Sequence, residues 1–410
     1  MEKTWLLKKE NLFIRIAIGF AIGILLGFLA PQFAIDTKVI GDIYLRLVKA
    51  MVIPILVCAV SVGIFNSGDI SSLKRVGVKT VILYVLLFLA SFMVSFVVAA
   101  IVRPGLGIKF ENQPVYEGEI GGPISLGSIL KGLIPKDASF IISAGSILPT
   151  IIVTIVFSII VMSLGERGEP VKSFMRKLSE VMFSILGYIM ELSPIGVMSL
   201  IAYSIAEYGS GIFMAIGKYI LCCWLACIAV FVLVFVMPVM AYVRPDLKAF
   251  LRVCGKVAIM AMSTTSSAAT LPTTISVSIE DLGAPESISN FTLPLGCTIN
   301  MCGGACSFCC LAMFVSEFYG LNLPPGQLMS MAIVATLINM AAPGIPGGGI
   351  VLMTSFLTIF KLPIDLIGPI SAFYRLLDMA FTTINVEGDV AANLIISKSE
   401  GFKLDRVGSV

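Results

Sequence analysis

The chain has 410 residues, of which 58% are hydrophobic and 13% charged, with a formal net charge of +3 and a mean hydropathy of +1.01. Repeated apolar runs near the ~20 residues needed to cross a bilayer predict a polytopic membrane protein and argue against a soluble one. The basic residues lie in short loops and form no patch, which excludes a nucleic-acid-binding protein.

The first apolar run covers residues 12–30 and follows three lysines, a pattern that a cleaved signal peptide would share. The run is long for a signal peptide, and it lacks an A-x-A cleavage pattern. We therefore interpret it as a retained first span. Hydropathy predicts five further spans, at residues 40–65, 77–103, 138–164, 179–208 and 212–243.

Basic residues flank alternate spans and so predict the orientation of the chain. They cluster before the first span and again within residues 74–79, 167–177 and 244–252. Positively charged loops stay in the cytoplasm, so all four clusters are expected there. The C-terminal segment is basic too, which predicts a multi-pass protein of the inner (plasma) membrane with both termini cytoplasmic. The longest exterior segment, about residues 104–139, is rich in Gly and Pro and predicts a surface loop.

Two breaks interrupt the apolar pattern beyond residue 250. The first is STTSSAATLPTT at residues 263–274, and the second is APGIPGGG at residues 342–349. A broken backbone at membrane depth leaves N–H and C=O groups unpaired, so it must be buried in protein or line a polar cavity. The flanking arms are too short to span separately, which predicts two re-entrant helical hairpins around a shared transporter binding site. Two proline-kinked spans are the alternative.

Between these breaks, the segment LPLGCTINMCGGACSFCC at residues 293–310 begins as an apolar helix and meets Asn300, Gly303 and Gly304 halfway. A glycine pair beside an asparagine can unwind one turn and present carbonyl oxygens, which suit a hard cation such as Na⁺. Close helix packing is the alternative role of the two glycines. The cysteines here and elsewhere lie in apolar stretches, so we predict buried free thiols in preference to disulfides or a metal site.

The stretch DMAFTTINVEGDV at residues 378–390 places three carboxylates in an apolar region. At about 100° per residue, one face of a helix would carry Asp378, Thr382, Asn385 and Asp389. Glu387 falls on roughly the opposite side. Asp389 is the candidate carboxylate for the cation shell.

Four features together resemble the dicarboxylate/amino acid:cation symporter family, the glutamate-transporter homologues. They are the serine-rich segment before TLP, the motif LPLGCTINM, the motif PGIPGGG, and DMAFTTINVEGD. The likeness covers nearly the whole chain. It implies an all-α membrane protein with eight transmembrane helices plus two re-entrant helical hairpins, assembled as a homotrimer.

The resemblance also implies how this single integral membrane domain, residues 1–410, is divided. A fixed scaffold would comprise roughly residues 1–76 and 138–208. A transport subdomain, roughly residues 77–103 and 212–400, would move like an elevator.

By the same resemblance, Asp378 matches the aspartate that holds a substrate's α-ammonium group. Asn385 and the pair Ser266–Ser267 match the groups that hold its α-carboxylate. An aspartate inside a membrane protein is costly unless a cation meets it. A contact between Asp378 and the nearby Arg375 is the alternative. The other substrate contacts implied are Thr382, Phe381, Gly304, Gly344 and Ile345.

The resemblance implies two sites for Na⁺, the coupling ion. Site 1 would use the backbone oxygens of Gly296, Asn300 and Asn385 with the carboxylate of Asp389. Site 2 would use the backbone oxygens of Thr298, Asn339, Met340 and Ala342, beside Met301. Glu387 matches no functional residue of the family, and we expect it to contact other helices.

The sequence departs from the family pattern where acidic substrates are held. Acidic-substrate members have an arginine and a threonine that bind the side-chain carboxylate, and here these positions are Phe381 and Gly304. An arginine found in some members at the first hairpin is Thr265 here. No cation would face a second carboxylate, so we predict a neutral amino acid as substrate.

A second departure concerns a third Na⁺ site of the family. Its oxygen side chains are replaced by Leu87, Phe88 and Cys302, and only Tyr84 remains. Thiols and apolar side chains do not replace hard oxygen ligands, so we expect this site to be absent.

The sequence therefore favours a Na⁺-coupled symporter for a neutral amino acid. Proton coupling stays open, because Asp389 or Glu387 could titrate if buried. The alternative function is proton-coupled or Na⁺-coupled transport of an acidic amino acid or a dicarboxylate. A channel would repeat polar residues along a whole span, whereas here they concentrate at one level. A membrane enzyme is disfavoured, since the chain has no histidine and only the Ser/Thr segment could supply a nucleophile.

Overall fold

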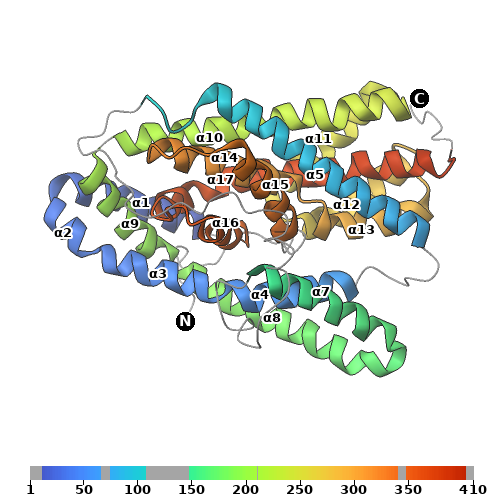
Figure 1. Ribbon diagram of the computed structural model, residues 1–410, viewed down its shortest axis with the longest axis horizontal. Helices are drawn as coiled ribbons and strands as arrows, with labels where there is room; N and C mark the ends of the chain where they lie inside the picture. The colour runs from blue at the N-terminus through green and yellow to red at the C-terminus, as the bar shows by residue number, and fades with distance from the viewer. Residues whose placement is uncertain (1–11, 66–73, 108–146, 210, 340–347, 403–410) are drawn as a thin grey trace.

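A computed structural model describes residues 12–65, 74–107, 147–209, 211–339 and 348–402, and every regular element within them is a helix (Figure 1). The first half of the chain forms α1 (Leu12–Leu29), α2 (Pro31–Asp36), α3 (Lys38–Ala50), α4 (Val52–Phe65), α5 (Lys74–Val102), α7 (Ile147–Ser163), the 3-10 helix η4 (Gly165–Gly168), α8 (Glu169–Glu191) and α9 (Ser193–Tyr208). Two π-helical segments, η5 (Phe231–Val236) and η6 (Val239–Val243), extend α10 (Gly211–Val230).

The second half forms shorter helices that surround one long one. In chain order they are α11 (Leu247–Thr264), α12 (Ser267–Glu280), α13 (Glu286–Ile299), α14 (Cys302–Phe318), α15 (Pro325–Asn339), α16 (Gly348–Ile359) and α17 (Ile367–Ser399). Helix α17 packs against α5, α10, α11, α12, α13 and α14. It therefore runs through the middle of the molecule (Figure 1), and most of its side chains are buried.

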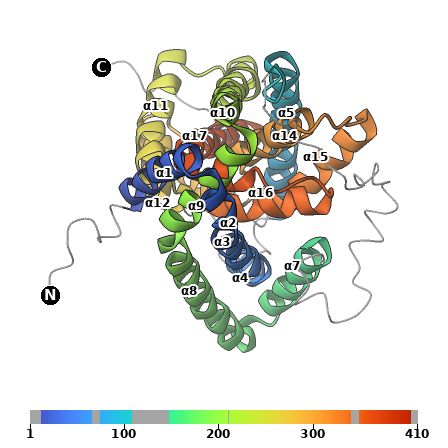
Figure 2. The ribbon, with the colours of Figure 1, turned by 90° about the vertical axis from the view of Figure 1, so that its left-hand side faces the viewer.

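The helices α3, α4, α7 and α8 lie to one side of this cluster (Figure 2). Helix α9 connects this region to the cluster, because it contacts α3 and α8 as well as α17, and α1 packs along α9. Three glycines of α1, at positions 19, 23 and 27, allow the close approach, because a Cβ on any of them would overlap atoms of α9. Small residues at a spacing of four are the usual means of close packing between helices in membranes.

Within the described residues, three helices are long and apolar enough to cross a membrane: Arg75–Val102, Gly211–Val243 and Glu286–Phe318. A bent pair, Gly165–Ile189 with Ser193–Glu207, adds a fourth candidate with a 49° bend. The predicted span 179–208 was therefore wrong in its start and in its continuity. Basic residues in the first turns of α8 lower its hydropathy, and Pro194 in the first turn of α9 starts a new helix.

The predicted spans 12–30, 77–103 and 212–243 agree with α1, α5 and the α10 to η6 helix within a few residues. The span 40–65 is instead two helices, α3 and α4, separated at Met51. The start of the span 138–164 and most of the predicted surface loop lie outside the described residues, and α7 begins at Ile147.

The first predicted break is a helical hairpin made of α11 and α12. Lys256 Nζ lies 2.7 Å from Asp281 Oδ2, an ion pair that joins the middle of α11 to the end of α12. The chain turns within Thr265, which has a left-handed φ of 49°, and Ser266, which is extended. Pro272 lies inside α12 and ends neither helix.

The second predicted break lies between α15 and α16, which contact each other. The connecting residues 340–347, which hold most of the motif PGIPGGG, lie outside the described residues. The helix that contains LPLGCTINM is interrupted between α13 and α14, as the sequence predicted. The non-helical residues are Asn300 and Met301, however, and Gly303 and Gly304 belong to the first turn of α14.

Candidate functional site

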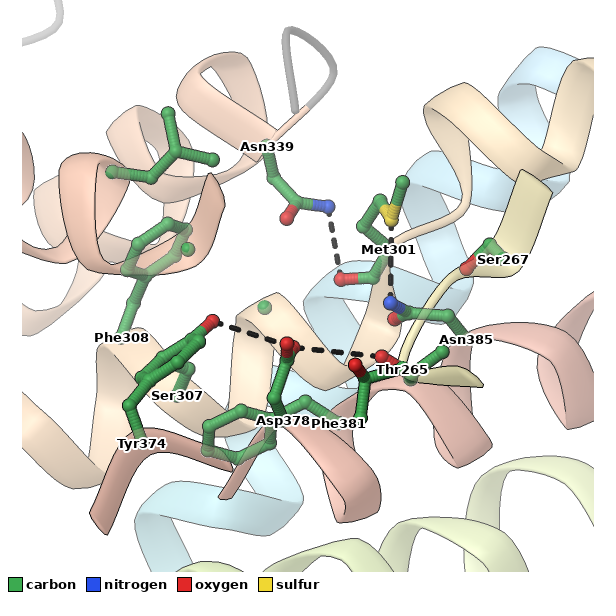
Figure 3. A pocket seen from close by; sticks show the side chains of 14 residues that line it. Thr265, Ser267, Met301, Ser307, Phe308, Asn339, Tyr374, Asp378, Phe381 and Asn385 are labelled. Carbon is green, nitrogen blue, oxygen red and sulfur yellow. Dashed lines mark hydrogen bonds between the residues drawn. The ribbon is translucent and has the colours of Figure 1, made fainter. Parts of the chain in front are cut away.

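Residues of the first hairpin, of the interrupted helix, of α15 and α16, and of α17 line a cavity of about 60 Å³ that has both polar and apolar side chains (Figure 3). A water molecule needs roughly 15 Å³ by the same measure, so the cavity has room for a few waters or a small solute. The lining residues are Thr265, Ser267, Met301, Gly304, Ser307, Phe308, Asn339, Gly349, Leu352, Tyr374, Asp378, Phe381, Thr382 and Asn385.

The predicted polar stripe of α17 supplies one wall of this cavity. Asp378, Thr382 and Asn385 all line it, because they recur on one face of the helix. Asp378 is only 8% exposed. Tyr374 Oη donates to Asp378 Oδ1 at 3.4 Å, and Thr382 Oγ1 donates to the same oxygen at 3.5 Å (Figure 3). Both bonds are long. The carboxylate of Asp378 lines the cavity.

Asn385 fixes the interrupted helix against α17. Its Oδ1 accepts from Gly303 N at 2.7 Å, and its Nδ2 donates to Met301 Sδ at 3.2 Å (Figure 3). The free N–H groups at the start of α14 therefore find an acceptor in a side chain, as helix termini require. The side chain that the resemblance assigns to a substrate carboxylate also holds the backbone of the break.

The first hairpin contributes Thr265 and Ser267 to the cavity lining. Ser266 was predicted as part of a carboxylate-binding pair, but it is absent from this lining. Its Oγ accepts from Ala269 N at 3.2 Å and caps the start of α12. The predicted pair is thus divided, with one serine at the cavity and the other at the helix terminus.

Arg375 reaches the same hairpin from α17. One guanidinium nitrogen donates to Thr265 Oγ1, and the other donates to Ser263 O at 3.1 Å. These bonds direct Arg375 to the hairpin, whereas the sequence left open a contact with Asp378. A cation therefore lies directly behind Thr265, although the described cavity lining does not include it.

Phe381 and Gly304 both line the cavity, on facing helices. The two glycines of α14 are sites of close packing: a Cβ on Gly303 would overlap the Phe381 carbonyl, and a Cβ on Gly304 would overlap Asn339 Oδ1. The alternative role that the sequence left open, close packing, is therefore the observed one.

Asp389 lies outside the cavity lining, in a separate buried polar cluster. It is 2% exposed, and its Oδ1 accepts from Asn300 Nδ2 at 2.9 Å. A Cβ on Gly296 would overlap this carboxylate and approach Tyr84 Oη. Among the described residues, no lysine or arginine forms an ion pair with Asp389. An unpaired buried carboxylate is costly, so a bound cation would stabilise this cluster.

The residues of the third family site lie beside this cluster. Leu87, Phe88 and Cys302 are buried, and Cys302 Sγ donates to Asn300 Oδ1 at 3.3 Å. Tyr84 Oη donates to the Thr292 carbonyl at 2.7 Å. The oxygen atoms left at this position are thus engaged within the protein.

The structure brings together only part of the predicted second Na⁺ site. Met301 and Asn339 meet at the cavity, where Asn339 Nδ2 donates to Met301 O at 2.9 Å. Thr298 is the penultimate residue of α13, lies outside the cavity lining, and its Oγ1 donates to Leu295 O. The remaining predicted residues fall outside the described part of the chain: Met340, Ala342, Gly344 and Ile345.

Sequence reasoning missed three cavity residues that helical spacing could have found. Tyr374 lies one turn before Asp378, and Ser307 and Phe308 lie one turn after Gly304. Glu387 is buried and absent from the cavity lining. All ten cysteines are free and buried, so the prediction of buried thiols is confirmed.

Comparison with known protein families identifies the family of this chain. The model of the sodium:dicarboxylate symporter family matches residues 12–399. The chain belongs to this family. The members of this family are transporters, so the protein is a symporter and not an enzyme. The family resemblance that the sequence indicated is confirmed.

Relatives within the sodium:dicarboxylate symporter family are similar over almost their whole length. A proton/sodium-glutamate symport protein of Geobacillus stearothermophilus is 29% identical over 96% of both chains. The protein of the same name from Bacillus subtilis is 26% identical over 96% of this chain and 94% of its own. A C4-dicarboxylate transport protein of Solibacter usitatus is 26% identical over 96% of this chain and 93% of its own.

Proposed function

We propose that the protein is a Na⁺-coupled symporter of a neutral α-amino acid. The observation that carries this proposal is the lining of the cavity. It includes the carboxylate of Asp378, the ring of Phe381, and Gly304, which has no side chain. A carboxylate suits an α-ammonium group. A phenyl ring and a glycine offer nothing to a second carboxylate.

The α-ammonium group would offset the cost of burying Asp378. A charged side chain inside a membrane protein is costly, and a ligand of opposite charge lowers that cost. The α-carboxylate of the substrate would lie towards Ser267 and Asn385, on the other side of the cavity from Tyr374 (Figure 3). The cavity volume favours a small substrate.

An acidic amino acid would bring its side-chain carboxylate against Phe381 and Gly304. An unpaired buried charge costs at least several kcal/mol, and even about 3 kcal/mol weakens binding more than a hundredfold. The oxygen of Asn339 beside Gly304 adds a repelling partial charge. Neutral side chains are therefore preferred.

The buried carboxylate of Asp389, which forms no ion pair with a lysine or arginine among the described residues, supports a Na⁺ site, because a carboxylate oxygen suits this hard cation. We propose a second Na⁺ site beside Met301 and Asn339, and no third site. A flux-ratio measurement tests this: it should give at most two Na⁺ per substrate. Three or more Na⁺ per substrate would contradict the loss of the third site.

The arrangement in the membrane follows the resemblance. We propose eight spans with cytoplasmic termini in the plasma membrane, and re-entrant hairpins formed by α11 with α12 and by α15 with α16. The interrupted helix of α13 and α14, flanked by these hairpins, supports this, since irregular backbone at membrane depth must line a cavity. A homotrimer whose transport part, residues 77–103 and 212–400, moves against a scaffold is proposed as well.

Transport of an acidic amino acid or a dicarboxylate is the second candidate, with proton or Na⁺ coupling. Two observations favour it: the names of the relatives refer to glutamate and C4-dicarboxylates, and the Arg375 guanidinium lies behind Thr265. A shift of this side chain into the cavity would supply a cation for a second carboxylate.

Reconstituted uptake separates the two candidates. Vesicles with an inward Na⁺ gradient should accumulate a neutral amino acid, and replacement of Na⁺ by choline should abolish accumulation. Excess aspartate, glutamate or succinate should leave this uptake nearly unchanged. Phe381→Arg, which adds a cation to the cavity, should shift preference towards acidic substrates. Strong inhibition of the unmodified protein by low aspartate would establish the second candidate instead.

A further inference from the structure

The side chain of Asn339 takes the space that Gly304 leaves. Asn339 is the last residue of α15, is 2% exposed, and lines the cavity. A Cβ at position 304 would overlap its Oδ1. The amide group of Asn339 therefore occupies the space that a side chain at position 304 would need. In Figure 3 it is on the side of the cavity opposite Asp378.

The hydrogen bonds fix which end of this amide faces Gly304. Asn339 Nδ2 donates to Met301 O at 2.9 Å, and Gly304 N donates to the same carbonyl at 2.8 Å. A carbonyl oxygen only accepts, so the nitrogen of the amide must face Met301. The oxygen then faces Gly304 and the cavity. None of the hydrogen bonds within the described part of the chain ends on Asn339 Oδ1.

A second polar side chain without charge lines the cavity from α14. Ser307 follows Gly304 by one turn of α14, is buried, and lines the cavity. A hydroxyl can donate or accept. α14 and α15 therefore each contribute one uncharged polar side chain to the cavity, Ser307 and Asn339.

We propose that Asn339 determines substrate specificity by accepting a hydrogen bond from the substrate's side chain. The substrate class is then a neutral α-amino acid whose side chain carries a hydrogen-bond donor, a hydroxyl or a carboxamide. This inference rests on the proposed function, because it takes the α-ammonium group to be at Asp378. A substrate anchored there directs its side chain towards Phe381, Gly304 and Asn339.

The physical reason is the cost of an unpaired acceptor. A purely apolar substrate would displace water from Asn339 Oδ1 and leave it without a donor, which costs about 1–3 kcal/mol. Sites that hydrogen-bond a substrate hydroxyl reject the analogue that lacks it far more strongly than apolar pockets reject an extra methylene. The amide oxygen therefore discriminates between side chains of equal size.

The test uses pairs of amino acids of matched shape. Threonine and valine differ by a hydroxyl in place of a methyl group, and serine and alanine differ by the hydroxyl alone. The full-length protein, reconstituted in vesicles with an inward Na⁺ gradient, is assayed for inhibition of uptake of its best neutral substrate by each amino acid. Threonine and serine should each inhibit at concentrations at least tenfold lower than their partners.

Variants then assign this preference to the amide. Asn339→Leu keeps the size and removes the acceptor, so the threonine-to-valine ratio should fall to about one. Gly304→Ala should lower the ratio as well, because its Cβ displaces the oxygen. Thr336→Val is the matched control: Thr336 lies one turn before Asn339, and its hydroxyl bonds only to the helix carbonyl of Ala332 among the described residues. This control should keep the ratio.

Each outcome has one meaning. Equal inhibition by threonine and valine in the unmodified protein, with Na⁺-dependent neutral uptake intact, overturns this inference and leaves the proposed function standing. Strong inhibition by aspartate or succinate overturns the proposed function itself. A wild-type ratio retained in Asn339→Leu assigns the preference to another group and also overturns the inference.

Discussion

Two buried aspartates of α17 have different surroundings and therefore different expected roles. Asp378 lines the cavity with two long contacts to neutral hydroxyls. Asp389 lies behind the cavity, beside the amide of Asn300 and the backbone of Gly296. The first is accessible to an organic ammonium group. The second is tightly packed against Gly296 and does not line the cavity.

Asp378→Asn should weaken substrate binding at least a hundredfold, because the α-ammonium group would be buried without its counter-ion at a cost of several kcal/mol. Equilibrium binding of the transported amino acid to purified protein measures this. Asp365→Asn, an exposed change before α17, is the control. Binding within tenfold of wild type in Asp378→Asn would place the ammonium group elsewhere.

Asp389→Asn should remove most of the Na⁺ dependence of uptake, since it strips the carboxylate from the proposed ion site. Uptake measured over a range of Na⁺ concentrations gives the result. Glu387→Gln is a matched control, because Glu387 is a buried carboxylate two residues away that does not line the cavity. If both variants responded to Na⁺ as wild type does, the site assignment would be wrong.

At the scale of the helices, the turn of the first hairpin (α11 and α12) is held by a side chain of another helix, α17. Its turn consists of Thr265 in a left-handed conformation and the capping Ser266. Such a backbone costs about 1 kcal/mol or more in a non-glycine residue. Arg375 donates to Thr265 Oγ1 and to Ser263 O, so helix α17 holds the turn in place.

Arg375→Ala should therefore raise the KM for substrate about tenfold or more, because two hydrogen bonds from a charged group are lost. Arg375→Lys should give an intermediate value, since an ammonium group cannot reproduce the guanidinium fork. Arg252→Ala, an exposed arginine of α11, serves as the control. The ranking of neutral over acidic substrates should not change. A selective loss of acidic-substrate inhibition in Arg375→Ala would show that Arg375 contacts substrate directly.

Across the whole molecule, the start of α5 is joined to the end of α17 by one carboxylate. Glu400 accepts from Lys79 Nζ at 2.5 Å and from Arg75, and its side chain is 5% exposed. Lys79 and Arg75 hold the pKa of Glu400 below its usual value through these hydrogen bonds. The contact links residues more than three hundred positions apart.

Glu400→Gln should lower the thermal unfolding midpoint at pH 7. A lowered folded-state pKa means that the ion pair stabilises the fold fully above the unfolded value of about 4.3, and that this stabilisation is lost as pH falls through the lower folded value. The difference between variant and wild type should therefore shrink in acid. Unfolding followed by fluorescence in detergent measures it, with the exposed Glu280→Gln as control. A difference that persists unchanged at low pH would assign the effect to packing.

Several features of the fold were predictable because they depend on local pattern. The stripe of Asp378, Thr382 and Asn385 follows from helical period alone, and it lines the cavity as expected. The first break and the interruption at Asn300 follow from polar residues inside apolar runs. Burial of the cysteines follows from the apolar segments that contain them.

By itself, the sequence determined the transporter class, the helical pattern and the polar stripe of α17, because hydropathy and helical period act over a few turns. Only the tertiary structure decided which atoms meet across helices: that Arg375 bonds the first hairpin, and that Asn339 fills the space beside Gly304. These contacts join segments distant in the chain. Their geometry depends on how closely the helices approach, which no local pattern encodes.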